Sequence, residues 1–450
     1  MSYERKRWHT HVFTSTYTAD VSGVCSAMYE LGGMTILHDP SGCNSTYTTH
    51  DEPRWYDSKS LMFVSGLDEM TAVMGDDSVL IRDAVRAAAD LKPRFITLCG
   101  ASIPHIISFD FKGVARLIER ETGIPVLPVA TDGLRSYISG AGLAFREWIR
   151  RFGDPEDAGR EDAGQKDAGL ADGRPGNEKL ENDSPENERP ENGSLGNEKP
   201  ENGSREDRLR KYGVNLLGVT PIDFSRQEIV DAMKQAFTDA GIPVNTCFAM
   251  GDSFETLTGV YRGAVNVVVS SAGRIPARFM KGAAGIPFVE GLPLGREMTA
   301  RLLAAVRETA ADGKDRRIFE DKEAREPGAK RPVTGIGAGV PGTGGGARVP
   351  HSTGILVIGE EIFSRTLAAA LGAEAFWPST DEGLDEDILM EKVNAARLVI
   401  GDPLFRTVLR NPETKFSEFP HEGYSGRIFR DRIPVFTGRD FKPEDLLVTK

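Results

Sequence analysis

Short apolar runs alternate with longer amphipathic stretches along the first third of the chain. The apolar runs are rich in β-branched and aliphatic residues, which is typical of buried strands, whereas the stretches at 78–91 and 112–122 have helical periodicity. Strands that alternate with helices form βαβ units with right-handed crossovers, so this pattern predicts a parallel sheet. The predicted strands span residues 33–38, 61–65, 95–99 and 124–129.

The same rhythm returns twice further along the chain. Strands are predicted at 213–219, 242–250, 265–270 and 285–289 in a second unit, and at 354–359 and 396–401, around a helix near 362–371, in a third. Ser225 and Glu228 match the capping-box pattern and predict the start of a helix that runs to about Gly241. The expected fold class is therefore α/β, with three Rossmann-like, doubly wound parallel-sheet domains and two low-complexity insertions.

Two low-complexity segments separate the three units. Residues 153–208 repeat Asp-Ala-Gly, Gly-Asn-Glu-Lys and Pro-Glu-Asn-Gly-Ser, and residues 311–352 are first charged and then Gly-rich. Such compositions offer too little apolar surface to offset the entropy lost on ordering. We expect a disordered insertion at 153–208 and a flexible linker at 311–352. They would separate an N-terminal α/β domain at 1–152, a second domain at 209–310 and a third, with a C-terminal segment, at 353–450.

Length and charge indicate the number of domains and argue against membrane-spanning and nucleic-acid-binding proteins. The 450 residues allow about three domains, and no stretch approaches the ~20 apolar residues that a membrane-spanning helix needs. The basic start of the chain is not followed by an apolar signal core, so we expect a cytoplasmic protein. With 67 acidic against 55 basic residues and a formal charge of -12, nucleic-acid binding is not expected.

Four cysteines in so long a chain do not form a disulfide scaffold. Cys25, Cys43 and Cys99 lie at ends of predicted strands or helices, so the fold can bring their thiols together. Thiolate sulfur suits iron–sulfur ligation, although free cysteines are also common in protein cores. Cys247 lies inside a predicted strand and is expected in the core. A zinc site with His38 is the alternative, but the close Cys-x-x-Cys pairs usual for zinc are lacking.

Several polar residues are further candidates. His38 lies five residues before Cys43 and either donates a hydrogen bond to a cluster sulfur or is a satisfied histidine at a strand end. His421 is a candidate metal ligand or proton donor near neutral pH, with a plain surface histidine as the alternative. A further set either lines an interface or pocket or is polar surface: His50, Asp51, Glu52 and Arg54.

Nucleotide-binding motifs are weak or lacking in the sequence. Gly218 and Gly359 follow predicted strands without a full dinucleotide fingerprint, and no Gly-x-x-x-x-Gly-Lys-Ser/Thr loop is evident. We therefore expect any ATP to be used by a partner protein.

The order of these signals resembles component 1 of the nitrogenase family, which includes the molybdenum–iron protein subunits and the dark-operative protochlorophyllide reductase subunits. Residues 38–43, His-Asp-Pro-Ser-Gly-Cys, are similar to the family's His-Gly-Pro-x-Gly-Cys cluster loop, with Asp39 in place of its glycine. Leu-Cys-Gly around Cys99 matches the family's third cluster cysteine, and residues 123–129 match the strand downstream of it. The stretch at 285–288 resembles another family segment, so the likeness covers most of the chain outside the low-complexity segments.

The resemblance implies an iron–sulfur cluster, 4Fe-4S or larger, at a subunit interface. Cys25, Cys43 and Cys99 would be its ligands. The family's first cysteine usually lies further upstream, near residues 18–20 here, so Asp20 is an alternative first ligand. His38 would lie beside the cluster and tune its potential.

His421 lies in a stretch, Pro-His-Glu-Gly-Tyr, that resembles the loop holding the histidine ligand of the family's metal cofactor, so a second metal cofactor is considered there. Two departures bear on the substrate. The cysteine that anchors this cofactor in the dinitrogen enzyme is missing, since its neighbourhood holds Val269, Ser270 and Ser271. The segment at 140–144 also lacks the substrate-binding histidine, so the resemblance implies a small-molecule substrate other than dinitrogen.

Three functions remain open on the sequence. The first is a nitrogenase-like reductase subunit that pairs with a homologous component 1 subunit, identical or not, and receives electrons from an ATP-dependent iron–sulfur reductase protein. The second is a non-catalytic scaffold or carrier for assembly of a metal cofactor, and the third is a zinc-stabilised module that binds small molecules. Turnover with a reductase would distinguish the first from the second, and zinc in place of iron would indicate the third.

Overall fold

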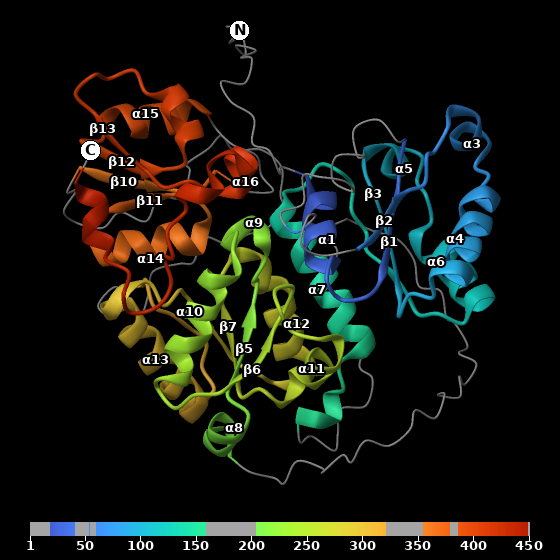
Figure 1. The fold of residues 1–450 in the computed structure, drawn as a ribbon, viewed down its shortest axis with the longest axis horizontal. Coiled ribbons are helices and arrows are strands. Elements are labelled where there is room, and N and C mark those ends of the chain that lie inside the picture. Colours follow the sequence, from blue (N-terminus) through green and yellow to red (C-terminus); the bar gives the residue numbers. More distant parts are fainter. Residues whose placement is uncertain are drawn as a thin grey trace, which may run out of the picture.

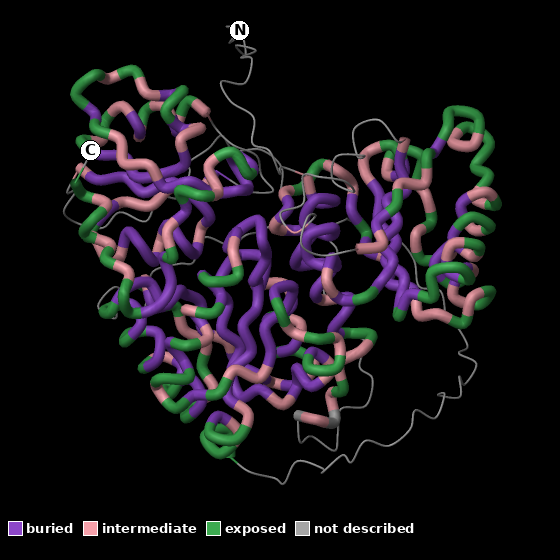
Figure 2. Tube along the Cα trace, viewed as in Figure 1, coloured by how far each residue is buried: buried purple, intermediate pink, exposed green. Residues whose placement is uncertain are grey.

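Three parallel sheets follow one another along the chain, each covered by helices (Figure 1). The computed structural model describes residues 19–40, 54, 60–158, 204–320, 354–378 and 386–448. The central strands of each sheet lie in the buried interior, and most exposed residues lie on the outer helices and loops (Figure 2). The expected α/β fold class with three doubly wound sheets is thus confirmed.

The first sheet has the strand order β2-β1-β3-β4. Its strands are β1 (Met34–His38), β2 (Leu61–Val64), β3 (Ile96–Gly100) and β4 (Val126–Pro128). The helices around it are α1 (Asp20–Met28), α3 (Glu69–Met74), α4 (Ser78–Leu91), α5 (Ser102–Ile106), α6 (Phe111–Thr122) and α7 (Tyr137–Phe152).

Side chains alternate between the two faces of the first sheet, as the pleat of a strand requires. Leu37 and Cys99 are paired across β1 and β3 and belong to the apolar core that includes α1 and α7. Ile36 and Leu98 belong to the separate core formed with α4 and α6. The first sheet therefore has one face toward the rest of the molecule and one face covered by its own outer helices.

The second sheet has the order β6-β5-β7-β8-β9. Its strands are β5 (Val214–Leu217), β6 (Val244–Cys247), β7 (Val265–Val268), β8 (Phe288–Glu290) and β9 (Arg316–Arg317). Its helices are α8 (Arg205–Lys211), α9 (Pro221–Phe224), α10 (Gln227–Thr238), α11 (Phe254–Thr258), α12 (Arg274–Ala284) and α13 (Gly295–Asp312).

The third sheet has the order β11-β10-β12-β13. Its strands are β10 (Ile355–Ile358), β11 (Glu374–Phe376), β12 (Leu398–Gly401) and β13 (Lys415–Glu418), and its helices are α14 (Glu361–Leu371), α15 (Glu386–Ala395) and α16 (Glu422–Ser425). Short 3-10 helices occur at Pro155–Ala158, Gly259–Arg262, Ser271–Gly273, Pro403–Val408, Gly426–Arg432 and Pro443–Leu447.

In each sheet the first strand lies between the second and the third. The chain therefore winds outward in both directions from the pairs β1/β3, β5/β7 and β10/β12. The crevice beyond the carboxyl ends of such a strand pair is where open α/β sheets bind ligands. The segments that follow these strands are accordingly the first place to look for functional residues.

Close contacts hold α1 against α7. A Cβ atom at Gly23 would lie 1.9 Å from the carbonyl oxygen of Tyr137, and one at Gly140 would lie 1.8 Å from that of Asp20. Only glycine permits backbones to approach this closely. This crossing fixes the position of α1, and with it Cys25, against the first sheet.

Aromatic packing and ion pairs are among the contacts that join the three units. The indole of Trp148 on α7 is fully buried and packs edge-on against Phe248 and Phe254 of the second unit, at centroid distances of 5.4 and 5.1 Å. Arg274 on α12 forms an ion pair of 2.9 Å with the fully buried Glu290 and another with Glu361 of the third unit. The second sheet is thus packed tightly between the other two units.

Most local expectations agree with the structure. The helix expected at 78–91 is α4, and α6 ends at Gly123, whose φ of 68° suits glycine at a helix C-terminus. The expected capping box is wrong. Helix α10 begins at Gln227 after Arg226, and no side chain caps its first turn. Ser225 instead ends α9 and points its hydroxyl elsewhere, so the helix starts later than the sequence pattern indicated.

The two low-complexity segments lie mostly outside the described residues. Ordered structure extends into both from their flanks: α8 begins at Arg205, capped by the Ser204 hydroxyl, and β9 pairs with β8 through Arg316 and Arg317. Within the described part of the chain, no helix combines the length and apolar character needed to cross a membrane.

Candidate functional site

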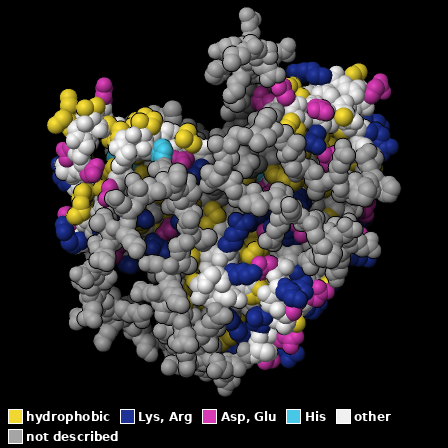
Figure 3. Space-filling model, turned by 180° about the vertical axis from the view of Figure 1, so that it is seen from behind, with side chains coloured by type: hydrophobic (Ala, Val, Ile, Leu, Met, Phe, Trp, Pro, Cys, Tyr) yellow, Lys and Arg dark blue, Asp and Glu magenta, His cyan; other side chains and the backbone are white. Residues whose placement is uncertain are grey.

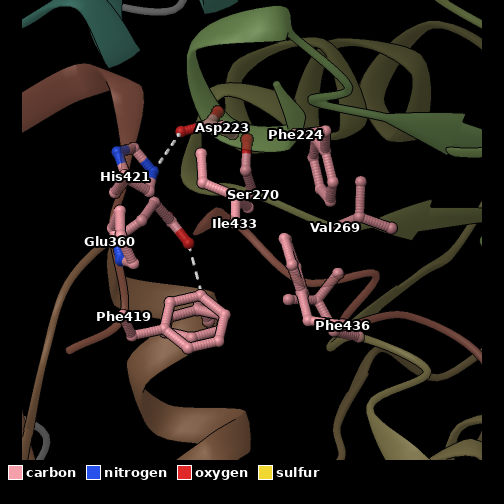
Figure 4. A pocket seen from close by; sticks show the side chains of 12 residues that line it. Asp223, Phe224, Val269, Ser270, Glu360, Phe419, His421, Ile433 and Phe436 are labelled. Carbon is pink, nitrogen blue, oxygen red and sulfur yellow. Dashed lines mark hydrogen bonds and ion pairs between the residues drawn. The ribbon is translucent and has the colours of Figure 1, made fainter. Parts of the chain in front are cut away.

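A small cavity lies between the second and third sheets, beyond the carboxyl ends of β5, β7, β10 and β13 (Figure 4). Its volume is about 10 Å³, which is the space that about one water molecule needs. The wall is mainly apolar, with polar groups gathered at one end. The lining residues are Asp223, Phe224, Val269, Ser270, Leu292, Glu360, Phe363, Phe419, Pro420, His421, Ile433 and Phe436.

His421 follows β13 and caps the N-terminus of α16. Its Nδ1 accepts a hydrogen bond of 3.0 Å from the backbone N–H of Gly423, so the proton of the neutral ring is on Nε2. Nε2 lies 3.4 Å from Oδ1 of Asp223 and has no hydrogen-bond partner within the described structure, although the side chain is only 10% exposed. The backbone N–H of His421 donates to Asp402, which fixes the loop on the end of β12.

Asp223 is the point where the three units meet. Its Oδ1 accepts a hydrogen bond of 2.8 Å from the hydroxyl of Tyr137 on α7, and its Oδ2 accepts one of 3.0 Å from Thr220. Burial and the Asp223 charge raise the pKa of Tyr137 well above its usual value, so the phenol stays a donor. Figure 4 shows the His421 ring directed at the same carboxylate from the third unit.

Glu360 follows β10 and lies at the N-terminus of α14, with 2% of its surface exposed. Its carboxylate accepts hydrogen bonds from the backbone N–H groups of Ser271, at 2.8 Å, and Phe363, at 2.9 Å. Burial, and then the negative charge of Asp223, raise the pKa of Glu360 to about 7, although both amides favour the ionised form. The cavity thus contains an acid that titrates near neutral pH.

The residues of this cavity do not fit the second metal cofactor considered from the sequence. No group of three or more His, Cys, Asp or Glu side chains that could hold a metal ion occurs among the described residues. The small volume and the aromatic walls leave space for about one water molecule. The arrangement instead holds protons at His421 and Glu360, beside the Asp223 carboxylate, in apolar surroundings.

The cysteines expected to bind a cluster lie in the first unit. Cys25 on α1 and Cys99 on β3 are both buried and belong to the same apolar core, on one face of the first sheet. The Cys99 thiol donates a weak hydrogen bond of 3.8 Å to the carbonyl of Ile36. Burial, and then the nearby Asp20 charge, raise the pKa of this thiol above its usual value. Cys43 lies outside the described residues. The other two expected ligands lie on elements that pack against each other, α1 and β3.

Asp20 has no exposed surface and uses both carboxylate oxygens within the first unit. They accept hydrogen bonds from the backbone N–H groups of Asp132, at 2.9 Å, and Gly133, at 3.0 Å. Burial, together with the Asp132 charge, raises the pKa of Asp20 to about 7, against the lowering effect of the two amides. In this arrangement Asp20 holds the loop after β4 against α1.

His38 lies at the end of β1, on the face opposite Cys99. Its Nδ1 lies 2.9 Å from the hydroxyl of Ser65, and its ring packs on Phe109 at a centroid distance of 4.2 Å. Burial lowers the pKa of His38 to about 4, so the ring is neutral at physiological pH. These contacts are those of a satisfied strand-end histidine, the second of the two interpretations open on the sequence.

Of the remaining candidates, His50, Asp51 and Glu52 lie outside the described residues. Arg54 donates hydrogen bonds to Glu30 and to the carbonyl of Ala249, so it joins the first and second units. Cys247 lies fully buried in β6, in the core as expected.

The sequence interpretation missed Tyr137, Asp223 and Glu360. Two of them follow strands: Glu360 comes two residues after Ile358, the last residue of β10, and Asp223 lies in the short helix after β5. A polar residue just beyond the carboxyl end of a central strand is the sequence signal that could have identified them. Tyr137 carries no such signal, because its place depends on how α7 packs.

Comparison with known proteins shows which proteins this chain resembles. A subunit of the light-independent protochlorophyllide reductase of Acaryochloris marina is 30% identical over 112 residues, which cover 24% of this chain and 22% of that protein. The corresponding protein of Gloeothece citriformis is 30% identical over 97 residues, which cover 21% and 19%. The aligned part thus spans about a fifth of the length of these relatives.

The solved structure of nitrogenase Cp1 at pH 6.5 has the same fold, with a TM-score of 0.57 at 13% identity, covering 93% of this chain and 88% of that one. The model of the nitrogenase component 1 type oxidoreductase family matches residues 23–330. Since this match covers more than half of the sequence, the chain belongs to the nitrogenase component 1 type oxidoreductase family.

Proposed function

We propose that this chain is a nitrogenase-like oxidoreductase subunit that carries an iron–sulfur cluster in its first unit, at a subunit interface. Cys25, Cys43 and Cys99 would hold the cluster. When bound, such a cluster accepts and passes on single electrons. The observation that supports the proposal most directly is the burial of Cys25 and Cys99 on the same face of the first sheet, in a chain of this family.

The two buried cysteines suit a cluster site for a physical reason. The crossing of α1 and α7 at Gly23 and Gly140 holds Cys25 firmly, and β3 holds Cys99 in a fixed strand register. Burial keeps the Cys99 thiol protonated in the absence of metal, so metal binding would have to displace a proton. Iron loading is therefore expected to fall as pH falls.

The cavity between the second and third sheets is the proposed substrate site, with His421 beside the substrate. No cysteine occurs among its lining residues in the described chain, which include Val269 and Ser270. This supports a substrate other than dinitrogen, because the cysteine that anchors the dinitrogen cofactor has no counterpart here. Asp223 and Glu360 complete the polar end of the site.

The proposed partners are a homologous component 1 subunit and an ATP-dependent iron–sulfur reductase. The sequence has no phosphate-binding loop with which to couple electron transfer to ATP hydrolysis. A separate reductase would supply that coupling and dock near the cluster.

Metal analysis of protein purified without oxygen tests the cluster. We expect iron and acid-labile sulfide in the wild type, and loss of most of the iron in Cys43→Ser and Cys99→Ser. Cys247→Ser is the matched control, because this buried cysteine lies in the second sheet and should leave the iron content unchanged. An iron-free wild type under cluster-loading conditions, or stoichiometric zinc, would overturn the proposal.

Electron transfer tests the reductase function separately. The loaded protein, its partner subunit, a nitrogenase-type reductase, ATP and dithionite are mixed, and the cluster is followed by absorbance after nucleotide addition. Reduction of the cluster is the expected result. If no such reductase passes an electron to an intact cluster, the carrier hypothesis takes its place, and formation of ammonia from dinitrogen would refute the substrate claim.

A further inference from the structure

The polar end of the cavity contains two proton-bearing side chains with different environments. His421 accepts the Gly423 N–H at Nδ1, so a second proton on the ring would break this hydrogen bond and place two N–H groups against each other. Its Nε2–H points toward the cavity and Asp223 without a hydrogen-bond partner in the described structure. His421 therefore presents a hydrogen-bond donor, Nε2–H, to the cavity.

Glu360 is balanced between its two protonation states. Burial and the neighbouring Asp223 disfavour the carboxylate, whereas the amides of Ser271 and Phe363 stabilise it through hydrogen bonds of 2.8 and 2.9 Å. No lysine or arginine lines the cavity in the described part of the chain. A group in this situation gives up a proton readily and is well stabilised after doing so.

We propose that Glu360, rather than His421, is the proton donor of this cavity, and that the ligand is a neutral compound with an apolar body and a basic nitrogen. The proton passes from the carboxyl oxygen of Glu360 to the lone pair of that nitrogen, and no electrons are exchanged in this step. The Ser271 and Phe363 amides then hold the carboxylate, which is reprotonated from solvent. The ligand assignment rests on the proposed function, whereas the assignment of the acid does not.

The side chains that line the cavity indicate the class of ligand. Aromatic rings from Phe224, Phe363, Phe419 and Phe436 favour an apolar body, and the negative charges of Asp223 and ionised Glu360 repel anions. The closed cavity has space for about one water molecule, so a larger ligand must part these rings. The Nε2–H of His421 offers a hydrogen bond to an acceptor on the same ligand.

Other titratable groups around Glu360 set the pH range in which it acts. Asp223 faces it from α9 and Tyr137 from α7, and His421, the N-cap of α16, lines the same cavity. Tyr424 on α16 acts on Tyr137. The adjacent Glu361 on α14 forms ion pairs with Arg274 and Arg365. Burial acts to raise the pKa of Glu361, but the two arginines hold it below the usual value. Glu360 is thus expected to titrate near pH 7.

Infrared difference spectroscopy of the ligand-free full chain tests the acid. Between acid and alkaline pH the wild type should lose protonated-carboxyl absorption with a midpoint near 7, and Glu360→Gln should lack part of that signal. Asp20 supplies a second signal that persists in the variant. The matched control Glu361→Gln should retain the full wild-type signal, because the Glu361 carboxylate is ionised throughout.

Two further measurements keep the test independent of the folding of Glu360→Gln. Asp223→Asn should move the carboxyl midpoint to lower pH, since it removes the charge that disfavours ionised Glu360. Nitrogen NMR of labelled histidine, assigned with His421→Gln, should place the proton of the neutral His421 ring on Nε2, with Nδ1 accepting the Gly423 N–H. A neutral ring protonated on Nδ1, or an unchanged carboxyl signal in Glu360→Gln, would overturn the assignment.

Pyridine and benzoate, which share an aromatic ring and differ in charge, probe the ligand class by ligand-observed NMR near pH 6. Pyridine should bind the wild type, with an affinity about tenfold lower in Glu360→Gln, and benzoate should not bind. Equal binding of benzoate, no pyridine binding, or pyridine binding that is unchanged in the variant would refute the ligand class. Iron content and electron transfer do not enter either experiment, so a failed cluster proposal would leave these results interpretable.

Discussion

Burial moves the pKa values of single side chains in opposite directions in this chain. It lowers the pKa of His38 to about 4 and raises that of Glu360 to about 7. The physical cause is the same, because the neutral form of each group is favoured away from water. Each shift links the stability of the folded chain to pH, and the sign depends on which form is neutral.

His38 should make the folded chain less stable in acid. Its pKa is lower in the folded state, so its stabilising contribution is complete above the ordinary value of 6.5 and is lost as pH falls from 6.5 toward 4. The loss attributable to this residue is about 3 kcal/mol at most. Urea unfolding of the wild type and His38→Gln between about pH 7 and about pH 5 should show a smaller acid loss in the variant.

A matched control for this prediction is His105→Gln on α5, a side chain that is not buried. It should keep the pH dependence of the wild type. The same acid loss in His38→Gln as in the wild type would show that His38 takes up its proton without unfolding the surrounding structure.

At the scale of elements, the turn between α9 and α10 shows why the helix cap predicted at Ser225 did not form. Ser225 has a φ of 60° and a ψ of -63°. The N–H of Arg226 donates a hydrogen bond to the carbonyl of Phe224, so these three residues form a γ-turn. Its hydroxyl donates to Glu422, a buried carboxylate that also pairs with Arg430. Contact with the third unit thus replaces the local helix cap.

Ser225→Ala should therefore destabilise the chain through Glu422 rather than through α10. The loss of a hydrogen bond to a buried charged group costs about 1–3 kcal/mol. In a double-mutant cycle on the free energy of unfolding, Ser225→Ala and Glu422→Gln should be coupled by about 1 kcal/mol or more. The effects of Ser225→Ala and Glu228→Gln on the free energy of unfolding should be additive within about 0.5 kcal/mol. Coupling of Ser225 to Glu228 and not to Glu422 would support the capping box instead.

At the scale of the whole molecule, one end of the first unit exposes apolar side chains. Helix α3 buries none of its residues, and Val73 on it is 77% exposed, while Ile106 on α5 is 72% exposed. Hydrophobic side chains gather over this end of the molecule in Figure 3 (yellow, upper left). Both helices follow strands of the first sheet at its carboxyl edge, where β1 leads toward Cys43. A contiguous exposed apolar surface is typical of an interaction site.

We expect the exposed apolar side chains of α3 and α5 to contact the homologous component 1 subunit proposed above as a partner. Val73→Lys and Ile106→Lys should each weaken subunit association by about tenfold, because a charge would have to be desolvated at the interface. The unfolding midpoint should not change, since both side chains are exposed. Sedimentation velocity over a range of concentrations measures the association.

Ile428 provides the control for this prediction. It is 78% exposed on the 3-10 helix Gly426–Arg432 of the third unit, away from α3 and α5. Ile428→Lys should leave association unchanged. If it weakens association as much as Val73→Lys does, the interface lies elsewhere or the effect is one of net charge alone.

The sequence alone determined the fold class and many of the central elements, although not α7, β9, β11 or β13. Strand and helix periodicity is a local property, so α4 and the central strands of all three sheets could be located without knowing their neighbours. The alternation of strands and helices then dictated parallel sheets, because parallel strands need crossover connections. Cys99 near the end of β3 was recognisable for the same reason, as a local pattern at a strand end.

Only the tertiary structure decided which side chains meet. Tyr137, Asp223, Glu360 and His421 come from four distant segments, and their convergence depends on the packing of three units against one another. The placement of His38 and Cys99 on opposite faces depends on the pairing of β1 with β3. Long-range packing also overrode the cap at Ser225, because a buried charge on Glu422 gains more from that hydroxyl than an exposed helix end does.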